Sequence, residues 1–121
     1  MNSFDITEWG KPLQQAVRAQ PQPSGTQVLI KVRYCGVCHS DVHIRDGFFE
    51  LGGGKRFHMT ERGMKLPVTL GHEPYGELIA MGPQAQGLAP VQVGKDYLVY
   101  PWTGCGQCAR CQQEQDNWCM T

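Results

Sequence analysis

The stretch TQVLIKVRYCGVCHSDVH, residues 26–43, joins the clearest predicted strand of the chain to a dense group of metal-binding residue types. Its first half, residues 26–34, places Val or Ile at every second position from 28 to 32, which is the period of a β-strand. Ser40 and Asp41 are residue types that cap helices, and the polar segment that they open ends at Gly47. The stretch therefore predicts a strand followed by a helix of about two turns.

The flanking sequence predicts further short strands. Prolines at 12, 21 and 23 punctuate an extended opening, residues 68–82 suggest strands bent at glycines and at Pro74, and residues 97–100 suggest another strand. The segment 48–66 is charged and glycine-rich, so we expect a surface loop there and assign it no fold. Short strands with glycine turns favour a mainly β, barrel-like fold with short helices.

Size and charge exclude several classes of protein. The chain has 121 residues, about one compact domain, and its 11 basic and 11 acidic side chains give a net charge of zero. A neutral chain has no basic surface to gather nucleic acid or an anionic membrane. The sequence contains neither a signal-peptide core nor a membrane-spanning apolar stretch, so we expect a cytoplasmic protein. Its six cysteines are then expected to be metal ligands or reactive thiols.

Four cysteines near the C-terminus follow the pattern CxxCxxCx7C: Cys105, Cys108, Cys111 and Cys119. Four thiolates make a closed tetrahedral zinc site, which fixes a loop and leaves no position for a reacting water. The segment 104–121 has few apolar residues, so bound metal is expected to order it as a lobe. The alternatives are unliganded reduced thiols and an iron–sulfur cluster, although Met120 stands where ferredoxin runs have proline.

A second group of ligand types consists of Cys38 and, about thirty residues later, His72 followed by Glu73. One thiolate and one imidazole, with a third protein ligand and an open position, form the kind of zinc site that polarises a substrate oxygen. CGVC, residues 35–38, could instead be a thioredoxin-like dithiol, but the βαβ context of that motif is missing. Each histidine taken alone is an ordinary surface or core residue.

Three motifs together resemble the medium-chain, zinc-dependent alcohol dehydrogenases, whose catalytic domain has a GroES-like β-barrel fold. They are GVCHSDVH at 36–43, LPVTLGHEPYG at 66–76 with Gly82 after it, and YPW at 100–102 followed by the cysteine lobe. They stand in the family's order, and the resemblance spans essentially the whole chain. It implies a zinc- and NAD- or NADP-dependent oxidation of a small alcohol to an aldehyde or ketone.

The resemblance also implies roles for individual residues. Cys38 and His72 would be two ligands of the catalytic zinc, with Glu73 close to that ion. Five further side chains would serve the proton, the coenzyme or the substrate: Ser40 taking the alcohol proton, His43 passing it to solvent, Asp41 orienting His72, His39 facing the coenzyme phosphates and Trp102 lining the substrate pocket. A half-buried core position is the alternative for Trp102.

The chain lacks two parts of the family pattern. Family members are much longer, and their remainder carries the third catalytic ligand, a cysteine, and the Rossmann coenzyme domain. Neither GxGxxG nor a phosphate-binding loop occurs here, since the glycines at 52–54 match neither pattern. We therefore expect residues 1–121 to be the N-terminal part of a catalytic domain, inactive alone, from an enzyme that forms homo-oligomers. The alternative is a standalone zinc-binding interaction module, and a zinc-ribbon nucleic-acid binder is disfavoured by the neutral charge.

Overall fold

Strands dominate the computed structural model, which describes residues 1–88 and 90–119. The last two residues of the predicted lobe, 120–121, lie outside that range. The strands are β1 Asn2–Ile6, β2 Gln14–Val17, β3 Val28–Cys35, β4 Phe48–Gly52, β5 Lys55–His58, β6 Val68–Thr69, β7 Pro74–Met81 and β8 Asp96–Leu98. The helices are short: α1 His39–Asp46 and α2 Ala109–Gln112, with 3-10 turns η1 Met59–Arg62 and η2 Asp116–Trp118. A mainly β fold with short helices is thus confirmed.

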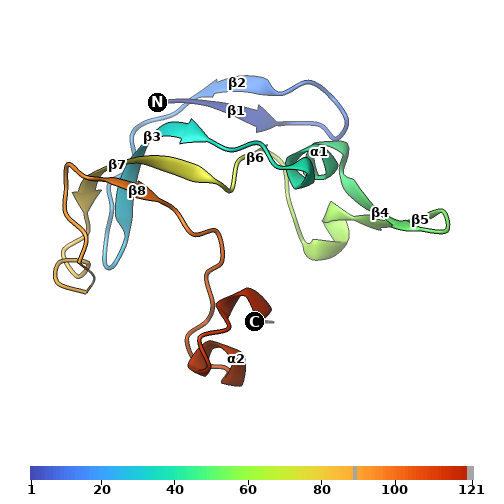
Figure 1. The fold of residues 1–121 in the computed structure, drawn as a ribbon. Helices are drawn as coiled ribbons and strands as arrows, with labels where there is room; N and C mark the ends of the chain where they lie inside the picture. The colour runs from blue at the N-terminus through green and yellow to red at the C-terminus, as the bar shows by residue number, and fades with distance from the viewer. Residues whose placement is uncertain (89, 120–121) are drawn as a thin grey trace.

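The strands form three antiparallel sheets, in the orders β2-β1-β6, β3-β7-β8 and β4-β5 (Figure 1). A closed barrel needs every strand to be paired on both sides. Among the residues described, β3 and β8 each pair only with β7, so the expected closed barrel is not present in this chain. None of the helices in the described residues is long and apolar enough to cross a bilayer.

The strand and the helix predicted from residues 26–47 both form, but the residue at the N-cap of the helix differs from the one expected. α1 begins after Cys38, whose backbone N–H donates to Asp41 Oδ2 at 3.0 Å, so Cys38 and not Ser40 is the capping position. α1 ends at Gly47, which has φ +89 and whose added Cβ would lie 3.0 Å from the Trp9 ring. Glycine is required there by both its backbone angle and the close packing.

The predicted loop at 48–66 is wrong in its first half, because residues 48–58 form the hairpin β4–β5. Figure 1 shows this hairpin projecting from the body of the molecule beside α1. The turn is made by the glycines at 52–54, all with positive φ. Phe48 and Phe49 give the strand its apolar contacts, and Met59 is buried at the base. The glycines at 52–54, which favoured a loop in the sequence, form the turn of a hairpin.

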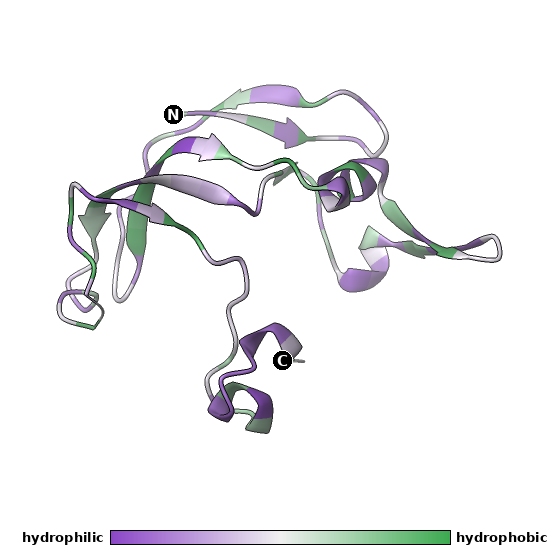
Figure 2. Cartoon of the chain, in the orientation of Figure 1, coloured by the Kyte–Doolittle hydropathy of each residue, from purple (hydrophilic) through white to green (hydrophobic). Residues whose placement is uncertain are grey.

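The fully buried apolar core is small among the described residues, and it consists of Ile6, Met59, Leu78 and Ala85. Figure 2 shows apolar segments distributed over all three sheets rather than gathered at one centre. Many large apolar side chains, including Val32, Tyr34 and Leu98, are exposed. The hydrogen-bonded sheets, and not a large core, therefore determine where the candidate ligands lie.

Candidate metal centres and active site

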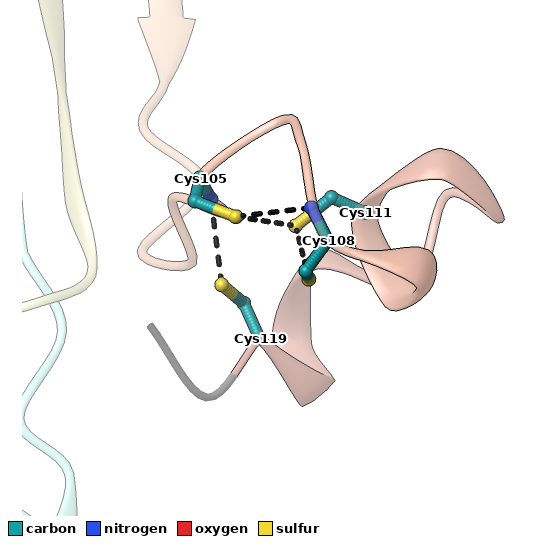
Figure 3. Close-up of side chains that lie close together, drawn as sticks. All are labelled: Cys105, Cys108, Cys111 and Cys119. Atoms are coloured by element: carbon teal, nitrogen blue, oxygen red, sulfur yellow. Dashed lines mark hydrogen bonds between the residues drawn. The ribbon is translucent and has the colours of Figure 1, made fainter.

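The four C-terminal cysteines converge on one point, as the sequence predicts. Their sulfur atoms all lie within 4.8 Å of one another, and Figure 3 shows the side chains directed toward a common centre. The Sγ–Sγ distances are 3.9 Å for Cys105–Cys111 and 3.5 Å for Cys108–Cys111. A tetrahedral zinc with bonds of about 2.3 Å separates its sulfur ligands by about 3.8 Å. The donor set therefore fits zinc.

Local backbone geometry brings these cysteines together. The backbone N–H of Cys108 donates to Cys105 Sγ at 3.3 Å, and that of Cys105 donates to Cys119 Sγ at 3.4 Å. Gly104 allows the close approach, because a Cβ there would lie 2.5 Å from Cys111 Sγ. Such N–H groups stabilise sulfur in its anionic form, which is the form that binds metal.

The surroundings of Cys111 keep its thiol protonated in the absence of metal. Burial raises the pKa of the Cys111 thiol to about 12, and hydrogen bonding with Cys108, Cys119 and Cys105 acts in the same direction. A divalent ion close to these sulfurs lowers their pKa and allows all four to ionise. Metal binding at this site would therefore be coupled to proton release.

The second ligand group is assembled by the pairing of β3 with β7. Cys35, the last residue of β3, pairs with Pro74, the first residue of β7, and Gly36 N–H donates to Glu73 O at 3.1 Å. The segment after β3 therefore runs beside the segment before β7. As a result one ligand atom each from Cys38, His72 and Glu73 lie within 4.8 Å of one another.

Asp41 connects the two segments. Its Oδ2 accepts the backbone N–H of Cys38 at 3.0 Å, and its Oδ1 lies 3.2 Å from His72 Nδ1. Asp41 is only 7% exposed. A carboxylate on one ring nitrogen directs the other nitrogen, here Nε2, toward a metal.

Electrostatics at this site favour the thiolate form of Cys38 and the protonated form of His72. Hydrogen bonds from the hydroxyl and backbone N–H of Ser40 lower the pKa of the Cys38 thiol, and His72 adds to the decrease. The hydrogen bond with Cys38 raises the pKa of His72 against the effect of burial, and Asp41 adds to the increase. Ser40 Oγ also lies 3.4 Å from His72 Nε2. The arrangement pairs a thiolate with a protonated histidine ring, and a metal bound between these two donor types would displace the proton from His72.

The remaining predicted residues lie around this site in different ways. His39 and His43 are one helical turn apart on α1, with ring centroids at 4.6 Å, and His39 is exposed. A pocket of about 240 Å³ opens beside the ligands and is lined by His72, Glu73 and residues 98–101. Trp102 follows this lining segment directly and is 56% exposed, so it is neither buried in the core nor among the residues that line the pocket.

Sequence reasoning missed the pocket wall at Leu98 and Val99. The structural cause is a hydrogen bond from Val99 N–H to Pro74 O at 2.9 Å, which carries the chain after β8 alongside His72 and Glu73. The apolar residues at the end of β8 were the feature of the sequence that could have indicated this wall. Only the β7–β8 register shows that they lie beside the segment that carries His72 and Glu73.

Comparisons with known proteins agree with this geometry. Residues 24–121 match the model of the alcohol dehydrogenase GroES-like domain. The chain is 42% identical over 119 residues to an NAD-dependent alcohol dehydrogenase of Saccharolobus solfataricus, covering 98% of this chain and 32% of that protein. It thus spans about a third of the length of such relatives.

Solved structures give the same result. The alcohol dehydrogenase of Aeropyrum pernix superposes with a TM-score of 0.78 at 27% identity, covering 99% of this chain and 32% of that one. A putative zinc-binding dehydrogenase of Sinorhizobium meliloti, solved bound to NADP, gives a TM-score of 0.74 at 27% identity over 99% of this chain and 30% of that one. From its motifs, its β3–β7 ligand geometry and these matches, this chain belongs to the alcohol dehydrogenase GroES-like domain family.

Proposed function

We propose that this chain is the N-terminal part of the catalytic domain of a zinc-dependent alcohol dehydrogenase, which oxidises alcohols to aldehydes or ketones by hydride transfer to NAD or NADP. The single observation that carries the proposal is the meeting of Cys38, His72 and Glu73 beside an apolar-walled pocket. Asp41 supports it, because this carboxylate contacts both ligand segments and orients His72.

Cys38 and His72 would hold the catalytic zinc, with Glu73 close to it and a third ligand from the rest of the full-length protein. The ion would supply Lewis-acid polarisation of the substrate oxygen. Ser40, whose hydroxyl already contacts the His72 ring, would take the alcohol proton, and His43 would pass it to solvent. His39 would face the coenzyme phosphates, and Trp102, at the end of the pocket wall, would limit the size of the alcohol.

The four-cysteine lobe would hold a structural zinc. All four positions around that ion would be filled by sulfur, so it would stabilise residues 104–119 without taking part in the reaction. Lobe and active site would then use zinc in two different ways within one chain.

A longer polypeptide would supply what this chain does not contain. The relatives are about three times as long, since the chain covers 32% of each. Their remaining length would provide the coenzyme domain and the strands that close the barrel. The complete enzyme would be a cytoplasmic homo-oligomer acting on small alcohols or aldehydes, without nucleic-acid or membrane partners. The 121-residue chain alone would be inactive.

Metal analysis of matched variants tests the proposal. Zinc per chain is measured by elemental analysis, alongside thiol titration, for the unaltered chain, Cys111→Ser and Cys38→Ser. We expect a full four-cysteine site and a partly occupied Cys38–His72 site, because fewer protein ligands hold zinc less well. Cys38→Ser should remove only the partial fraction, and Cys35→Ser, which alters a neighbouring cysteine, should leave it unchanged. Metal content that is insensitive to Cys38→Ser would contradict the catalytic site.

Activity and gene structure provide the second test. Alcohol-dependent NAD reduction by the purified 121-residue chain would overturn the expectation that it is inactive. The reading frame beyond Thr121 separates the two functional candidates. Continuation into a glycine-rich βαβ stretch supports the enzyme, whereas a stop codon supports a standalone zinc-binding module.

A further inference from the structure

The hairpin β4–β5 places an aromatic ring against the histidine that we propose as the proton relay. The Phe49 and His43 ring centroids are 4.8 Å apart and the ring planes are tilted by 44°. His43 also contacts His39, so it is the middle ring of a row of three. His39 and His43 share a face of α1, whereas Phe49 reaches the row from the hairpin.

The base of the hairpin is rigidly connected to α1. Gly47 ends the helix, β4 starts at the next residue, and the backbone N–H of Met59 donates to Gly47 O at 2.9 Å. Met59 itself is fully buried. The two ends of the hairpin are therefore held together at the helix terminus, which places Phe49 beside His43.

The two faces of the hairpin have separate contacts. Neighbouring residues of a strand point to opposite faces. Phe48 pairs with His58 and lies under the Arg56 guanidinium at 4.0 Å, and Arg56 in turn forms an ion pair with Glu50. Phe49 pairs with Phe57 on the other face, which is the face that contacts α1. Phe48 is therefore a matched control for Phe49.

We infer that Phe49 is a positioning residue for His43, holding the imidazole ring in the orientation in which it can pass a proton from the active site to solvent. The inference rests on the proposed function. An imidazole on a helix surface rotates about two side-chain bonds, and an aromatic neighbour at this distance restricts that rotation through the packing of the two tilted rings. Proton transfer requires the ring nitrogens to be aligned with their partners, so this restriction acts on the rate of proton exit.

The contact is tested by NMR of the histidine rings in the zinc-loaded chain. Phe49→Leu keeps apolar volume in the hairpin but removes the ring, and it should remove the Phe49 contribution to the ring-current displacement of the His43 signals. Phe49→Tyr should restore that displacement, and Phe48→Leu should leave it in place. Unchanged His43 signals in Phe49→Leu, or an equal change in Phe48→Leu, would overturn the inference.

The functional consequence is tested in the full-length enzyme. Phe49→Leu should lower kcat by roughly two- to twelve-fold, the equivalent of a typical aromatic pair, with little change in KM. The deficit should be reduced by added imidazole, an external proton carrier, and Phe49→Tyr should recover kcat. An unchanged kcat, or a loss that imidazole and Phe49→Tyr both fail to restore, would overturn the role. Zinc content is measured on the same samples. If the unaltered enzyme holds no ion at Cys38 and His72, the proposed function fails, whereas a full zinc content with unchanged kcat overturns only the role of Phe49.

Discussion

At Asp41, one buried carboxylate contacts both halves of the candidate catalytic site. Its two oxygens bind the Cys38 backbone and the His72 ring, so neither ligand segment is oriented independently of the other. Ser40 then acts on Cys38 and His72 from the adjacent position of the same helix. The orientation of the two ligands consequently depends on a few hydrogen bonds at the start of α1.

Replacing Asp41 should weaken the catalytic metal site selectively. Asp41→Asn removes the negative charge that favours the metal-directed His72 ring, and zinc affinity at Cys38–His72 should fall by about 10- to 100-fold. Competition with a fluorescent zinc chelator measures the change. Asp46→Asn, which alters a carboxylate paired with Arg45 at the other end of α1, is the control and should leave this affinity unchanged.

Asp5 gives the chain a pH dependence at acidic pH. Arg18 first, and Thr69 at 2.7 Å second, lower the pKa of this 2% exposed carboxyl from 3.8 to about 2. The unfolded chain binds the proton more tightly, so the stabilisation is fully present above about pH 4. It is lost as the pH falls from there through 2.

The prediction for Asp5 is checked by unfolding in denaturant at several pH values. Asp5→Asn should lower the free energy of unfolding at neutral pH and flatten its dependence on pH between about 4 and 2. An unaltered slope in that window would show that the ion pair with Arg18 does not contribute to stability.

Among the elements, the β3–β7 pair determines the active site and the lobe is a separate unit. The register from Val28–Met81 to Cys35–Pro74 places Gly76 against β3, where an added Cβ would lie 2.2 Å from Lys31 O. Within its described residues, 104–119, the lobe contains α2 and η2, and in Figure 1 it lies apart from the sheets on the segment that follows β8. Under the proposed function, its order would therefore depend on metal bound by its own four cysteines.

Removing zinc should unfold the lobe and leave the sheets folded. With a strong chelator, amides of residues 105–119 should lose protection from hydrogen exchange, while β3 and β7 amides remain protected. Cys111→Ser without chelator should reproduce the result. Acidification should also favour unfolding of the lobe, because protons compete with zinc for the thiolates. Simultaneous loss of protection in β7 would show that lobe and sheet unfold together.

For the molecule as a whole, the small core makes stability depend on few side chains. Leu78 lies at 1% exposure in the middle of β7, where it pairs with Ile30, whereas Leu98 on the adjacent strand is 73% exposed. Apolar side chains of β3 and β8, including Val32, Tyr34 and Leu98, are exposed to solvent in this chain.

Truncation of Leu78 should therefore be severe. Leu78→Ala should cost about 2–5 kcal/mol of unfolding free energy, a large share of the ~5–15 kcal/mol typical of a domain. Denaturant unfolding measures this loss. Leu98→Ala removes the same atoms from an exposed position and should change stability by less than about 0.5 kcal/mol. Equal losses of unfolding free energy in the two variants would show that the burial of Leu78 does not stabilise the fold.

The sequence alone determined the local features: the strand at 26–34, the helix ending at Gly47 and the cysteine spacing of the lobe. These features depend on residues a few positions apart, so periodicity and ligand spacing are sufficient to predict them. The hairpin at 48–58 was missed because its glycines suit a loop equally well.

Only the tertiary structure decided which distant residues meet. Cys38 and His72 are 34 positions apart, and their approach follows from the β3–β7 register with its two bulges, as does the pocket wall after β8. Register, bulges and the burial of Asp41 depend on packing across the sheet, which no local pattern encodes. For the same reason the sequence could not foresee that the expected barrel would stay open in this chain.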